Sequence, residues 1–427
     1  MRILLVSHKY PPYAMGGVEV YTRNLAQALH PQHEIAVFFR HDDDSGPLFA
    51  ETDDRDGGIF KRRVSYNPTG LGASVAGQFF ETFLNRHIED SFTRLLSQFQ
   101  PDLVHVQHVM ALSARLITLA RQAGLPVVLT LHDYWFICSN SQLIWPDAQP
   151  CRGKAAGMNC VRCAAAARFP SRLVGPLRPA LAPLFVYRDR VVDKAARQAN
   201  HFVSPSRFLI DKYIAAGFPP DRFLFLENGL PLHRIRQFRW RPSDGPLRVT
   251  FLGSLAWQKG VHILAEAYRG LPPGTARLQI WGNPHVFPQY AQQLRQILPN
   301  PAAELKGPIA NEHVGEVLAD SDVMVVPSVW YENSPVVIQE ARAAGLPVVV
   351  SGHGALAEKV QHGVNGLHFP PGDATALRRI LARLAGDADL LAKLRQNIPA
   401  PMDMSKHAQR LEILYRQVML QRQAVDG

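Results

Sequence analysis

The sequence predicts an α/β protein made of two Rossmann-like domains, each with a parallel β-sheet between layers of helices. Its 427 residues exceed what one ordinary hydrophobic core supports, and two domains of about 200 residues are expected. Short apolar segments alternate with amphipathic ones in both halves, as in parallel strands joined by helical crossovers. A polar, proline-spaced stretch at 228–246 separates the two series and is interpreted as the linker.

The first predicted domain spans 1–227. Its strands are RILLVS, HEIAVFFR, PDLVHVQH and LPVVLTLHD, and its first helix is GGVEVYTRNLAQALH. A segment at about 138–170, rich in Cys, Pro, Gly and Ala, interrupts this alternation and is interpreted as an insertion. A basic, increasingly helical stretch follows at 173–199, and a strand and a helix that starts at Ser-Pro-Ser complete the domain.

The second predicted domain spans 247–404. Its strands are LRVTFLGS, ARLQIWG, DVMVVPS, LPVVVSG and GLHFPP. The last predicted helix, 405–427, is long enough to pack back across the first domain. Two such domains facing one another predict an interdomain cleft at the carboxyl ends of both sheets, where open α/β sheets bind ligands.

Composition indicates a folded chain, with 47% hydrophobic and 19% charged residues. No segment approaches the roughly 18 apolar residues that span a bilayer. The apolar run from Ile3 to Val6 is too short for the core of a signal peptide, so a cytoplasmic protein is expected. The net charge of +10 favours an anionic partner, namely nucleic acid, nucleotide phosphates or an acidic membrane, although solubility alone explains it equally well.

The four cysteines are confined to one short stretch, at Cys138, Cys151, Cys160 and Cys163. Disulfides are rare in cytosolic proteins, whereas the CVRC pair and two further thiolates could complete a tetrahedral zinc site. Four protein ligands leave no open position on the metal, so such a site would be structural. The alternative is four reduced thiols on a loop.

Two features of the first domain suggest ligand contacts. Gly16 and Gly17 stand between the first strand and the first helix, where a backbone without Cβ atoms can approach a phosphate or a sugar. His132 and Asp133 follow a strand, so the imidazole of His132 could bind a sugar hydroxyl or move a proton. A simple chain turn and a capping histidine are the alternatives.

The second domain carries the more specific pattern. Lys259 precedes a helix start and can reach a phosphate. In WYENSPVVIQEA, Pro335 suits the first helical position, and the free amides of Val336 and Val337 would point at an anion. Glu332 and Glu340 can accept hydrogen bonds from sugar and ribose hydroxyls, each worth about 1.5–3 kcal/mol. Together these groups predict a site for a nucleotide sugar.

These motifs resemble glycosyltransferase family 4, through GGVEVYTRNLA, LHDYW, VSPSRF, ENGLP, FLGSLAWQKG, ENSPVVIQE, AAGLPVVVS and GVNGLHFPPGD. The resemblance covers nearly the whole chain. It implies the GT-B fold and a retaining transfer from a nucleotide-sugar donor to a glycan or a polyprenyl- or other lipid-linked acceptor, without an obligatory catalytic metal. Bacterial surface polysaccharide or lipopolysaccharide assembly is the setting that it implies.

The resemblance also implies roles for individual residues. Glu340 matches the ribose-binding acid, Glu332 the acid facing the donor sugar, and Lys259 the pyrophosphate lysine, while Gly17 and His132 match groups near the donor. The catalytic candidates are Glu332, His132 and Lys259, and the donor-binding candidates are Gly16, Gly17, Ser254, Lys259, Gly307, Glu332, Asn333, Ser334, Val336, Val337 and Glu340. Gly253-Ser254-Leu255 stands where the family usually has G-R-L, so a second phosphate cation is missing there.

Three other classes of protein share single features with this sequence. A nicotinamide-dependent oxidoreductase would need a G-x-G-x-x-G after the first strand, where this chain has YPPYAMGGVE. A sugar-nucleotide epimerase on the same scaffold would keep the nucleotide site without an acceptor. A nucleic-acid binder is disfavoured because no recognition helix or interleaved aromatic run accompanies the cysteines.

The sequence also contains a basic segment and a short acidic run, which have different interpretations. Basic residues beside Leu and Phe suggest a peripheral seat on an anionic membrane, at the inner face of the plasma membrane, with a helical cover on the first domain as the alternative. These residues are Arg168, Arg172, Arg178, Arg188, Arg190, Lys194 and Arg197. The run from Asp42 to Asp44 is interpreted as solvated charge in a surface loop rather than a metal site.

Overall fold

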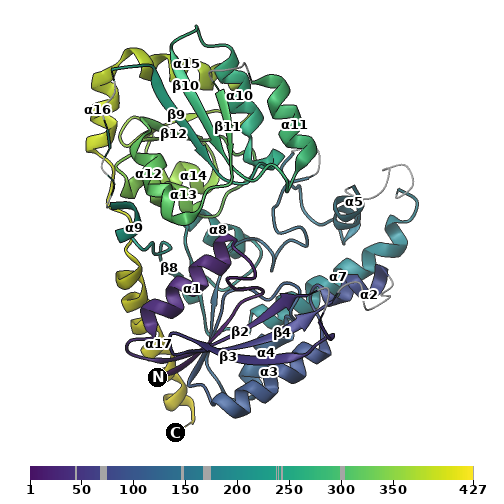
Figure 1. Cartoon of the computed structure of the whole chain (residues 1–427). Coiled ribbons are helices and arrows are strands. Elements are labelled where there is room, and N and C mark those ends of the chain that lie inside the picture. Colours follow the sequence, from purple (N-terminus) through teal and green to yellow (C-terminus); the bar gives the residue numbers. More distant parts are fainter. Residues whose placement is uncertain are drawn as a thin grey trace. The chain divides into compact units, whose positions relative to one another are not determined.

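The computed structural model describes residues 1–43, 46–67, 75–145, 149–166, 175–236, 238, 240–241, 244–298 and 303–426. The chain divides into two compact units, whose helices and strands are labelled in Figure 1. Unit 1 comprises Met1–Gly229 and Met404–Gly427, and unit 2 comprises Leu230–Asp403. The sequence placed these domains at 1–227 with 405–427 and at 247–404. The predicted interdomain cleft stays a prediction.

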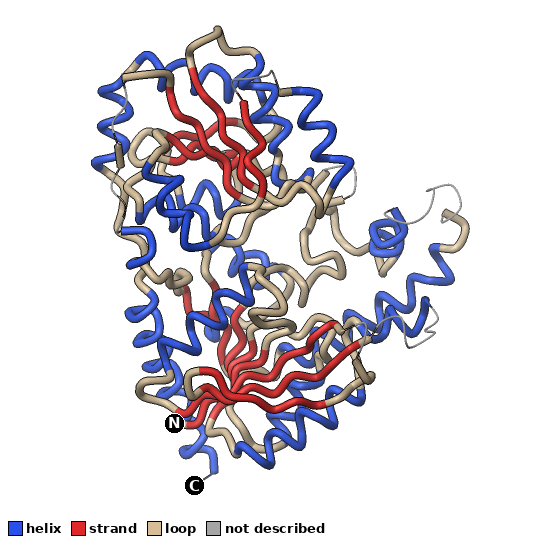
Figure 2. The backbone as a smooth tube through the Cα atoms, viewed as in Figure 1, coloured by secondary structure: helices blue, strands red, loops and turns tan. Residues whose placement is uncertain are grey.

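Unit 1 is built on a sheet that has eight strands within the described residues, in the order β3-β4-β2-β1-β5-β6-β7-β8 (Figure 2). Its strands are β1 (Arg2–Val6), β2 (Glu34–Asp42), β3 (Glu51–Asp56), β4 (Ile59–Tyr66), β5 (Leu103–Val106), β6 (Val127–Thr130), β7 (His201–Ser204) and β8 (Phe223–Phe225). All neighbouring strands pair in parallel except β3 and β4, which form an antiparallel hairpin at one edge.

Helices cover both faces of this sheet. The helices of unit 1 are α1 (Gly17–Leu29), α2 (Val75–Glu81), α3 (Arg86–Phe99), α4 (Arg115–Gln122), α5 (Met158–Ala166), α7 (Arg178–Ala196), α8 (Arg207–Ala215) and α17 (Met404–Asp426), with the 3₁₀ turn η1 (Pro220–Arg222). In Figure 1, α1 and α17 lie on one side of the sheet, and α3 and α4 lie on the other. Strands covered on both faces need apolar residues at successive positions, and Ile3, Leu4 and Leu5 are all fully buried.

Unit 2 is built on a sheet whose six strands in the described residues run parallel, in the order β11-β10-β9-β12-β13-β14. Its strands are β9 (Leu247–Leu252), β10 (Ala276–Trp281), β11 (Ala303–Gly307), β12 (Val323–Val326), β13 (Val348–Ser351) and β14 (Gly366–Phe369). Its helical segments are α9 (His233–Arg236), η2 (Trp257–Lys259), α10 (Val261–Arg269), α11 (Pro288–Ile297), η3 (Asn311–His313), α12 (Val314–Ala319), α13 (Val336–Ala343), α14 (Gly354–Lys359), α15 (Ala374–Gly386) and α16 (Ala388–Gln396).

The residues of strand β12 show that both faces of the unit 2 sheet are covered. Val323 and Val325 belong to one hydrophobic cluster, and Met324 and Val326 belong to another. Side chains alternate between the faces of a strand, so each cluster fills one side of the sheet. The sheet therefore presents its carboxyl edge, rather than either face, to a ligand.

Four strands were not predicted from the sequence, namely β3, β4, β8 and β11. The β3–β4 hairpin turns at Gly57 and Gly58, both with positive φ, and β3 is the polar run ETDDRD. Strand β11, at the edge of unit 2, has no fully buried position. An edge strand has a neighbouring strand along one edge only, and its other edge faces solvent. Its residues can therefore be polar, and hydrophobic periodicity in the sequence does not reveal it.

The linker prediction at 228–246 needs correction. Leu230, Leu232 and Ile235 from this stretch are buried in the unit 2 core, and α9 packs against α12 and α13. Trp240 donates a hydrogen bond from Nε1 to Oδ1 of Asp322 at 3.2 Å. Much of the stretch is therefore part of unit 2, and its polar composition concealed the three apolar anchors.

Among the described residues, no helix combines the length and the apolar character needed to cross a membrane.

Candidate functional site

Lys259 is held at the carboxyl end of β9 by the glycine that follows it. Gly260 has φ +69°, and a Cβ built there would lie 1.9 Å from the carbonyl oxygen of Pro327, just after β12. Only glycine accommodates both this conformation and this contact. The short 3₁₀ turn η2 therefore presents Lys259 at the edge where β9 and β12 end.

Glu332 is the centre of a hydrogen-bond network at the same edge. Its Oε1 accepts from Nζ of Lys259 at 2.7 Å. The same oxygen accepts from Oγ of Ser328 at 2.7 Å and from Nε1 of Trp330 at 2.9 Å. Glu332 is only 5% exposed, and three donors on one oxygen fix the orientation of its carboxylate. An oriented carboxylate of this kind can use its second oxygen for a sugar hydroxyl.

Helix α13 begins directly after this network. Pro335 is its N-cap with φ −60° and ψ 120°, so the helix starts at Val336, one residue later than the sequence predicted. Proline in this extended conformation cannot itself be the first helical residue. The first amides of a helix have no intrahelical acceptor, and among the residues that the structure describes no side chain caps those at Val336 and Val337. Oγ of Ser334 is also buried without a hydrogen-bond partner. These donors form a setting suited to an anion.

Glu340 lies further along α13 and is paired with an arginine that the sequence analysis did not single out. Nη2 of Arg234, in α9, donates to Oε1 of Glu340 at 2.6 Å. Glu340 is 5% exposed. Burial raises the pKa of Glu340 above its usual value, while Arg234 acts in the opposite direction. The two acids of the E-x7-E pair therefore each have a cationic partner within unit 2.

His353 is another residue of this edge that the sequence analysis missed. It is the N-cap of α14, just after β13, and its Nε2 lies 3.0 Å from the carbonyl oxygen of Ser328. Its ring lies 5.3 Å from that of Tyr331. Burial lowers the pKa of His353, so its neutral ring donates the hydrogen bond to that carbonyl. Its position after a strand end was the signal that could have identified it.

The remaining unit 2 candidates lie at strand and helix ends. Asn333 is 7% exposed beside Glu332. Ser254 is exposed after β9. Gly307 ends β11 with φ +84°, and its carbonyl accepts from the amide of Gly282 at 2.9 Å. No cation that replaces the family's arginine is assigned at Ser254.

The diglycine of unit 1 stands at the start of α1, where the two residues have different surroundings. Gly16 is the N-cap, and a Cβ there would lie 2.4 Å from Oε2 of Glu19, whereas a Cβ at Gly17 would meet nothing within 4 Å. Glu19 in turn lies 3.1 Å from Nε2 of His8. Gly17 therefore leaves open space, and Gly16 makes room for a buried carboxylate.

His132 lies at the end of β6, as predicted, with its Nε2 3.0 Å from Oε1 of Gln107. Burial lowers the pKa of His132 to about 3, and the nearby His108 acts in the same direction. A ring that stays neutral at physiological pH is suited to hydrogen bonding rather than to donating a proton. The geometry thus favours the first of the two predicted roles.

A second imidazole–carboxylate pair accompanies His132. Nε2 of His108 lies 3.2 Å from Oδ2 of Asp133, and the rings of His8 and His108 are 4.8 Å apart. Nδ1 of His108 accepts from the amide of Met110 at 3.1 Å. His8 and His108 were not predicted, although both follow strands that end at the same edge as β6.

The four cysteines are all free thiols. Cys160 and Cys163 lie one turn apart on α5. Burial raises the pKa of the Cys163 thiol to about 11, and Cys138, Cys151 and Cys160 act in the same direction, so the four thiols lie near one another. Within the described part of the chain, no three His, Cys, Asp or Glu side chains are arranged to hold a metal ion. The zinc site therefore stays a prediction, and it would require the thiols to move closer.

One of the predicted membrane-facing cations belongs to the interior. Arg188 is 2% exposed, lies over the ring of Trp135 at 4.7 Å and donates to the Trp135 carbonyl at 2.7 Å. Arg197 pairs with Asp193 at 2.7 Å and lies over the ring of Phe218. Arg188 is a correction, because the periodicity of α7 turns its side chain inward, whereas Arg197, the C-cap of α7, stays partly exposed. Arg168 and Arg172 lie outside the described residues.

Asp42 is exposed, as expected for solvated charge, but it lies in a strand rather than in a surface loop. It ends β2, with Lys9 at 2.5 Å and Arg40 at 2.9 Å. Partial burial acts to raise the pKa of Asp42, but these two cations hold it below its usual value. Asp43 lies in the following turn, and Asp44 lies outside the described residues.

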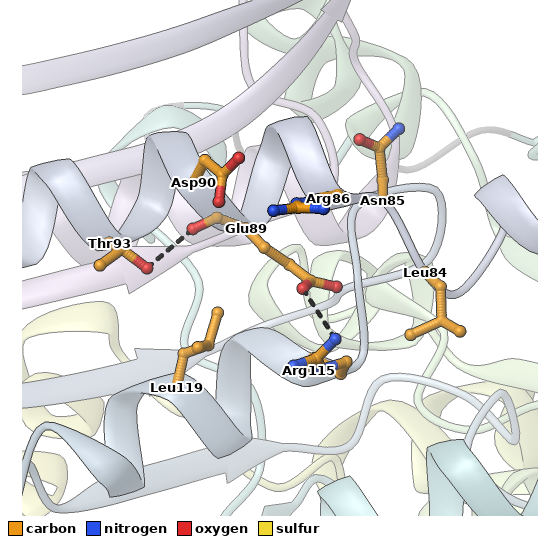
Figure 3. Close-up of a pocket in the computed structure, with 8 residues that line it drawn as sticks. All are labelled: Leu84, Asn85, Arg86, Glu89, Asp90, Thr93, Arg115 and Leu119. Atoms are coloured by element: carbon orange, nitrogen blue, oxygen red, sulfur yellow. Dashed lines mark hydrogen bonds and ion pairs between the residues drawn. The ribbon is translucent and has the colours of Figure 1, made fainter.

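A separate polar pocket of about 440 Å³ lies between the starts of α3 and α4 in unit 1 (Figure 3). Glu89 faces Arg115 across it at 3.3 Å. The hydroxyl of Thr93 donates to the Glu89 carbonyl at 2.9 Å. None of its residues was predicted to bind a ligand, and its lining carries both charge signs. It is lined by Leu84, Asn85, Arg86, Glu89, Asp90, Thr93, Arg115 and Leu119.

Solved structures share this architecture over nearly the whole chain. Sucrose-phosphate synthase from Thermosynechococcus elongatus matches with a TM-score of 0.70 and 19% identity, covering 98% of this chain and 99% of that one. The Anabaena protein HepE in complex with UDP-glucose matches with a TM-score of 0.68 and 19% identity, covering 98% and 100%. These likenesses and the two parallel-sheet units define the GT-B fold of glycosyltransferases.

Sequence comparison identifies the family. Residues 15–234, more than half of the chain, match the family model for Glycosyltransferase Family 4, and residues 246–387 match that for Glycosyl transferases group 1. The protein belongs to glycosyltransferase family 4 and is a glycosyltransferase.

Two relatives illustrate the range of the family. The amylovoran biosynthesis glycosyltransferase AmsK of Erwinia amylovora is 30% identical over 201 residues, which are 45% of this chain and 49% of AmsK. The chain thus aligns with about half of the length of AmsK. The glycogen synthase of Mycobacterium tuberculosis is 25% identical over 422 residues, 94% of this chain and 91% of that protein.

Proposed function

We propose that this protein transfers a hexose, with retention of configuration, from a nucleoside-diphosphate sugar to a glycan or lipid-linked acceptor in the assembly of a bacterial surface polysaccharide. The observation that carries the proposal is the clustering of Lys259, Glu332 and the uncapped start of α13 at one edge of the unit 2 sheet. Solved GT-B structures bound to UDP and UDP-glucose support the donor class. The polysaccharide setting is supported by AmsK.

The proposed donor contacts follow from the chemistry of these groups. Lys259 and the amides of Val336 and Val337 bind the diphosphate, because they supply positive charge and N–H donors. Glu332 binds the donor sugar through its second carboxylate oxygen, and Glu340 binds the ribose diol.

The same groups promote departure of the nucleoside diphosphate. Negative charge develops on the leaving phosphate, and Lys259 with the helix-start amides stabilises it without reorganisation. The acceptor hydroxyl attacks the face from which the phosphate departs, and its proton passes to the leaving phosphate. This route retains the anomeric configuration and needs no carboxylate nucleophile or catalytic metal.

The experiment that tests the donor site is a thermal-shift panel of UDP, GDP, ADP, CMP and NAD on the wild type and on Glu340→Ala. Stabilisation by one nucleoside diphosphate that is lost in the variant supports the site and identifies the base. Stabilisation by NAD alone would contradict it and favour an oxidoreductase. Absence of any shift would count against a nucleotide site altogether.

A second measurement separates transfer from epimerisation. The matching nucleotide sugars are incubated with the protein, and products are followed by proton NMR. Slow release of the nucleoside diphosphate with a free sugar of unchanged anomeric configuration supports a retaining transferase. Inverted sugar would contradict retention, and an epimerised nucleotide sugar without release would indicate the epimerase.

A peripheral seat on an anionic membrane is proposed for the outward side of α7 and the turn before it. Leu177, Leu181 and Tyr187 are large apolar side chains that are 56%, 38% and 48% exposed. Arg190 and Lys194 continue the same helix with exposed cations. Tyr187, Arg190 and Lys194 are spaced by three and four residues, so they lie along one side of the helix, as in an interfacial segment, whereas Leu177 and Leu181 lie nearer its start.

Liposome flotation tests this seat. Arg190→Glu with Lys194→Glu is expected to reduce binding to vesicles of phosphatidylglycerol and phosphatidylcholine, because each basic residue near such a surface contributes about 1 kcal/mol. The control is Lys406→Glu with Arg410→Glu, which makes the same charge change at exposed positions of α17. Equal losses of vesicle binding in both variants would show that only the net charge of the protein matters. Unchanged vesicle binding in the α7 variant would exclude this seat.

A further inference from the structure

The two residues of the Arg234–Glu340 pair come from segments far apart in the sequence. Nη2 of Arg234 lies 2.6 Å from Oε1 of Glu340, 106 positions along the chain. The arginine side chain is 16% exposed and the glutamate side chain 7%. Contacts between a cation and a carboxylate at this distance and depth are screened little by water.

The backbone of α9 is fixed where it delivers Arg234. Ile235, the next residue, is fully buried in the same hydrophobic cluster as Ile338 and Ala341 of α13. On the other side, a Cβ at Gly315 of α12 would lie 3.0 Å from the carbonyl oxygen of Arg234. Arg234 is therefore held between two helices rather than carried on a free linker.

Arg234 is the charged group that acts on the carboxyl of Glu340 among the described residues. Burial raises the pKa of Glu340, and Arg234 opposes this effect through its charge and its hydrogen bond. Arg342, on the same helix, donates instead to the carbonyl of Lys359 in α14. On α12, Glu316 faces His313 at 3.7 Å. Without Arg234, a buried carboxylate would have no cation to keep it ionised.

From this geometry we infer that Arg234 is a positioning residue of the donor site: it holds Glu340 ionised and oriented so that the carboxylate can accept hydrogen bonds from the ribose of a nucleoside diphosphate. The inference rests on the proposed function, because it assumes that Glu340 binds the ribose. It assigns a role to a residue in the segment that the sequence analysis treated as a linker. Arg234 acts through Glu340 and need not touch the phosphate itself.

The test is the pH dependence of nucleoside diphosphate binding, measured by calorimetry with UDP first, or with whichever diphosphate the thermal-shift panel selects. Arg234→Met is expected to weaken binding at least tenfold relative to wild type at pH 6.5 and less than threefold at pH 9. Loss of the cation lets Glu340 hold a proton at the lower pH, and the proton leaves as pH rises. Titration of the ligand phosphate affects both proteins and cancels in the ratio.

Two further variants keep the inference falsifiable. Arg234→Lys retains the charge, so its ratio to wild type should vary little with pH. In the Glu340→Gln background, Arg234→Met should weaken binding no further, because Gln does not titrate. Weakening by Arg234→Met that is equal at every pH, or that persists in the Glu340→Gln background, would overturn the inference while leaving the donor site intact. Wild-type affinity in Glu340→Gln alone would instead overturn the proposed ribose contact.

Discussion

Lys259 and Glu332 form a partly buried ion pair, with Nζ of the lysine 2.7 Å from Oε1 of the glutamate. The two residues are separated by 73 positions in the chain and come from the ends of two neighbouring strands, β9 and β12. The proposed phosphate cation and the proposed sugar-binding acid are thus joined before any donor binds. Each orients the other, which reduces the reorganisation that donor binding requires.

Replacing each partner of this pair should affect different parts of the donor. Lys259→Met is expected to weaken UDP binding by about 10- to 100-fold, because a charged hydrogen bond contributes about 1.5–3 kcal/mol, and to leave uridine binding nearly unchanged. Glu332→Gln should bind UDP within about threefold of wild type but lose most turnover of the nucleotide sugar. Calorimetry and a diphosphate-release assay make these measurements. An equal loss of uridine affinity in Lys259→Met would point to a structural defect.

Gly260→Ala should destabilise unit 2 far more than an alanine at another glycine with positive φ. The new methyl group would overlap the Pro327 carbonyl, 1.9 Å away, so the strands or the turn must shift. Gly274→Ala is the control, since Gly274 has φ +81° and open space around it. We expect a cost of about 1–3 kcal/mol for the control, from backbone strain alone, and a clearly larger loss for Gly260→Ala. Urea unfolding followed by tryptophan fluorescence compares the two, and similar losses would contradict this explanation.

Three buried histidines of unit 1 predict a loss of stability on mild acidification. Burial lowers the pKa of His105 and of His132 to about 3, and that of His407 to about 4. Below the unfolded pKa of about 6.5, the unfolded chain takes up protons that the folded state excludes. The free energy of unfolding should therefore fall between about pH 6.5 and pH 4 and be unaffected by these groups at higher pH.

His407 offers the cleanest variant for this prediction. Its Nε2 lies 2.6 Å from the hydroxyl of Tyr21, and its Nδ1 donates to the Glu227 carbonyl at 2.8 Å, which ties α17 to α1. His407→Gln should reduce the slope of unfolding free energy against pH by up to one proton, or about 1.4 kcal/mol per pH unit. His87→Gln, at an exposed position, should leave the slope unchanged. Equal slopes in all three proteins would contradict the assignment.

The cysteine insertion gives a prediction about metal content. If the thiols move together around zinc, the purified protein should contain one zinc ion per chain by elemental analysis, and removing it with a chelator should lower the melting temperature. Cys163→Ser should lose the metal, whereas Ser139→Ala, in the same segment, should retain it. Four thiols that react freely with Ellman's reagent in a metal-free native protein would refute the zinc site.

Local patterns accounted for most of the fold and for the unit 2 site. The alternation of apolar strands and amphipathic helices located the central strands of both sheets, because buried strands need continuous apolar runs. Local signals in the sequence, namely a strand end, a glycine and a helix start within a few residues of each other, indicated Lys259, Glu332, Val336 and Val337. The polar edge strands β3 and β11 were missed because no such periodicity constrains them.

The sequence by itself thus determined the two α/β units, the family and the polar groups at the strand ends. Only the tertiary structure decided how those groups are paired. It placed Arg234 against Glu340, Glu19 against His8, and Arg188 over Trp135 rather than at a membrane. Such pairs join separate elements of the fold, and they form because a buried charge or hydrogen-bonding group must find a partner when water is excluded. That requirement acts on the folded arrangement, so spacing along the chain does not reveal it.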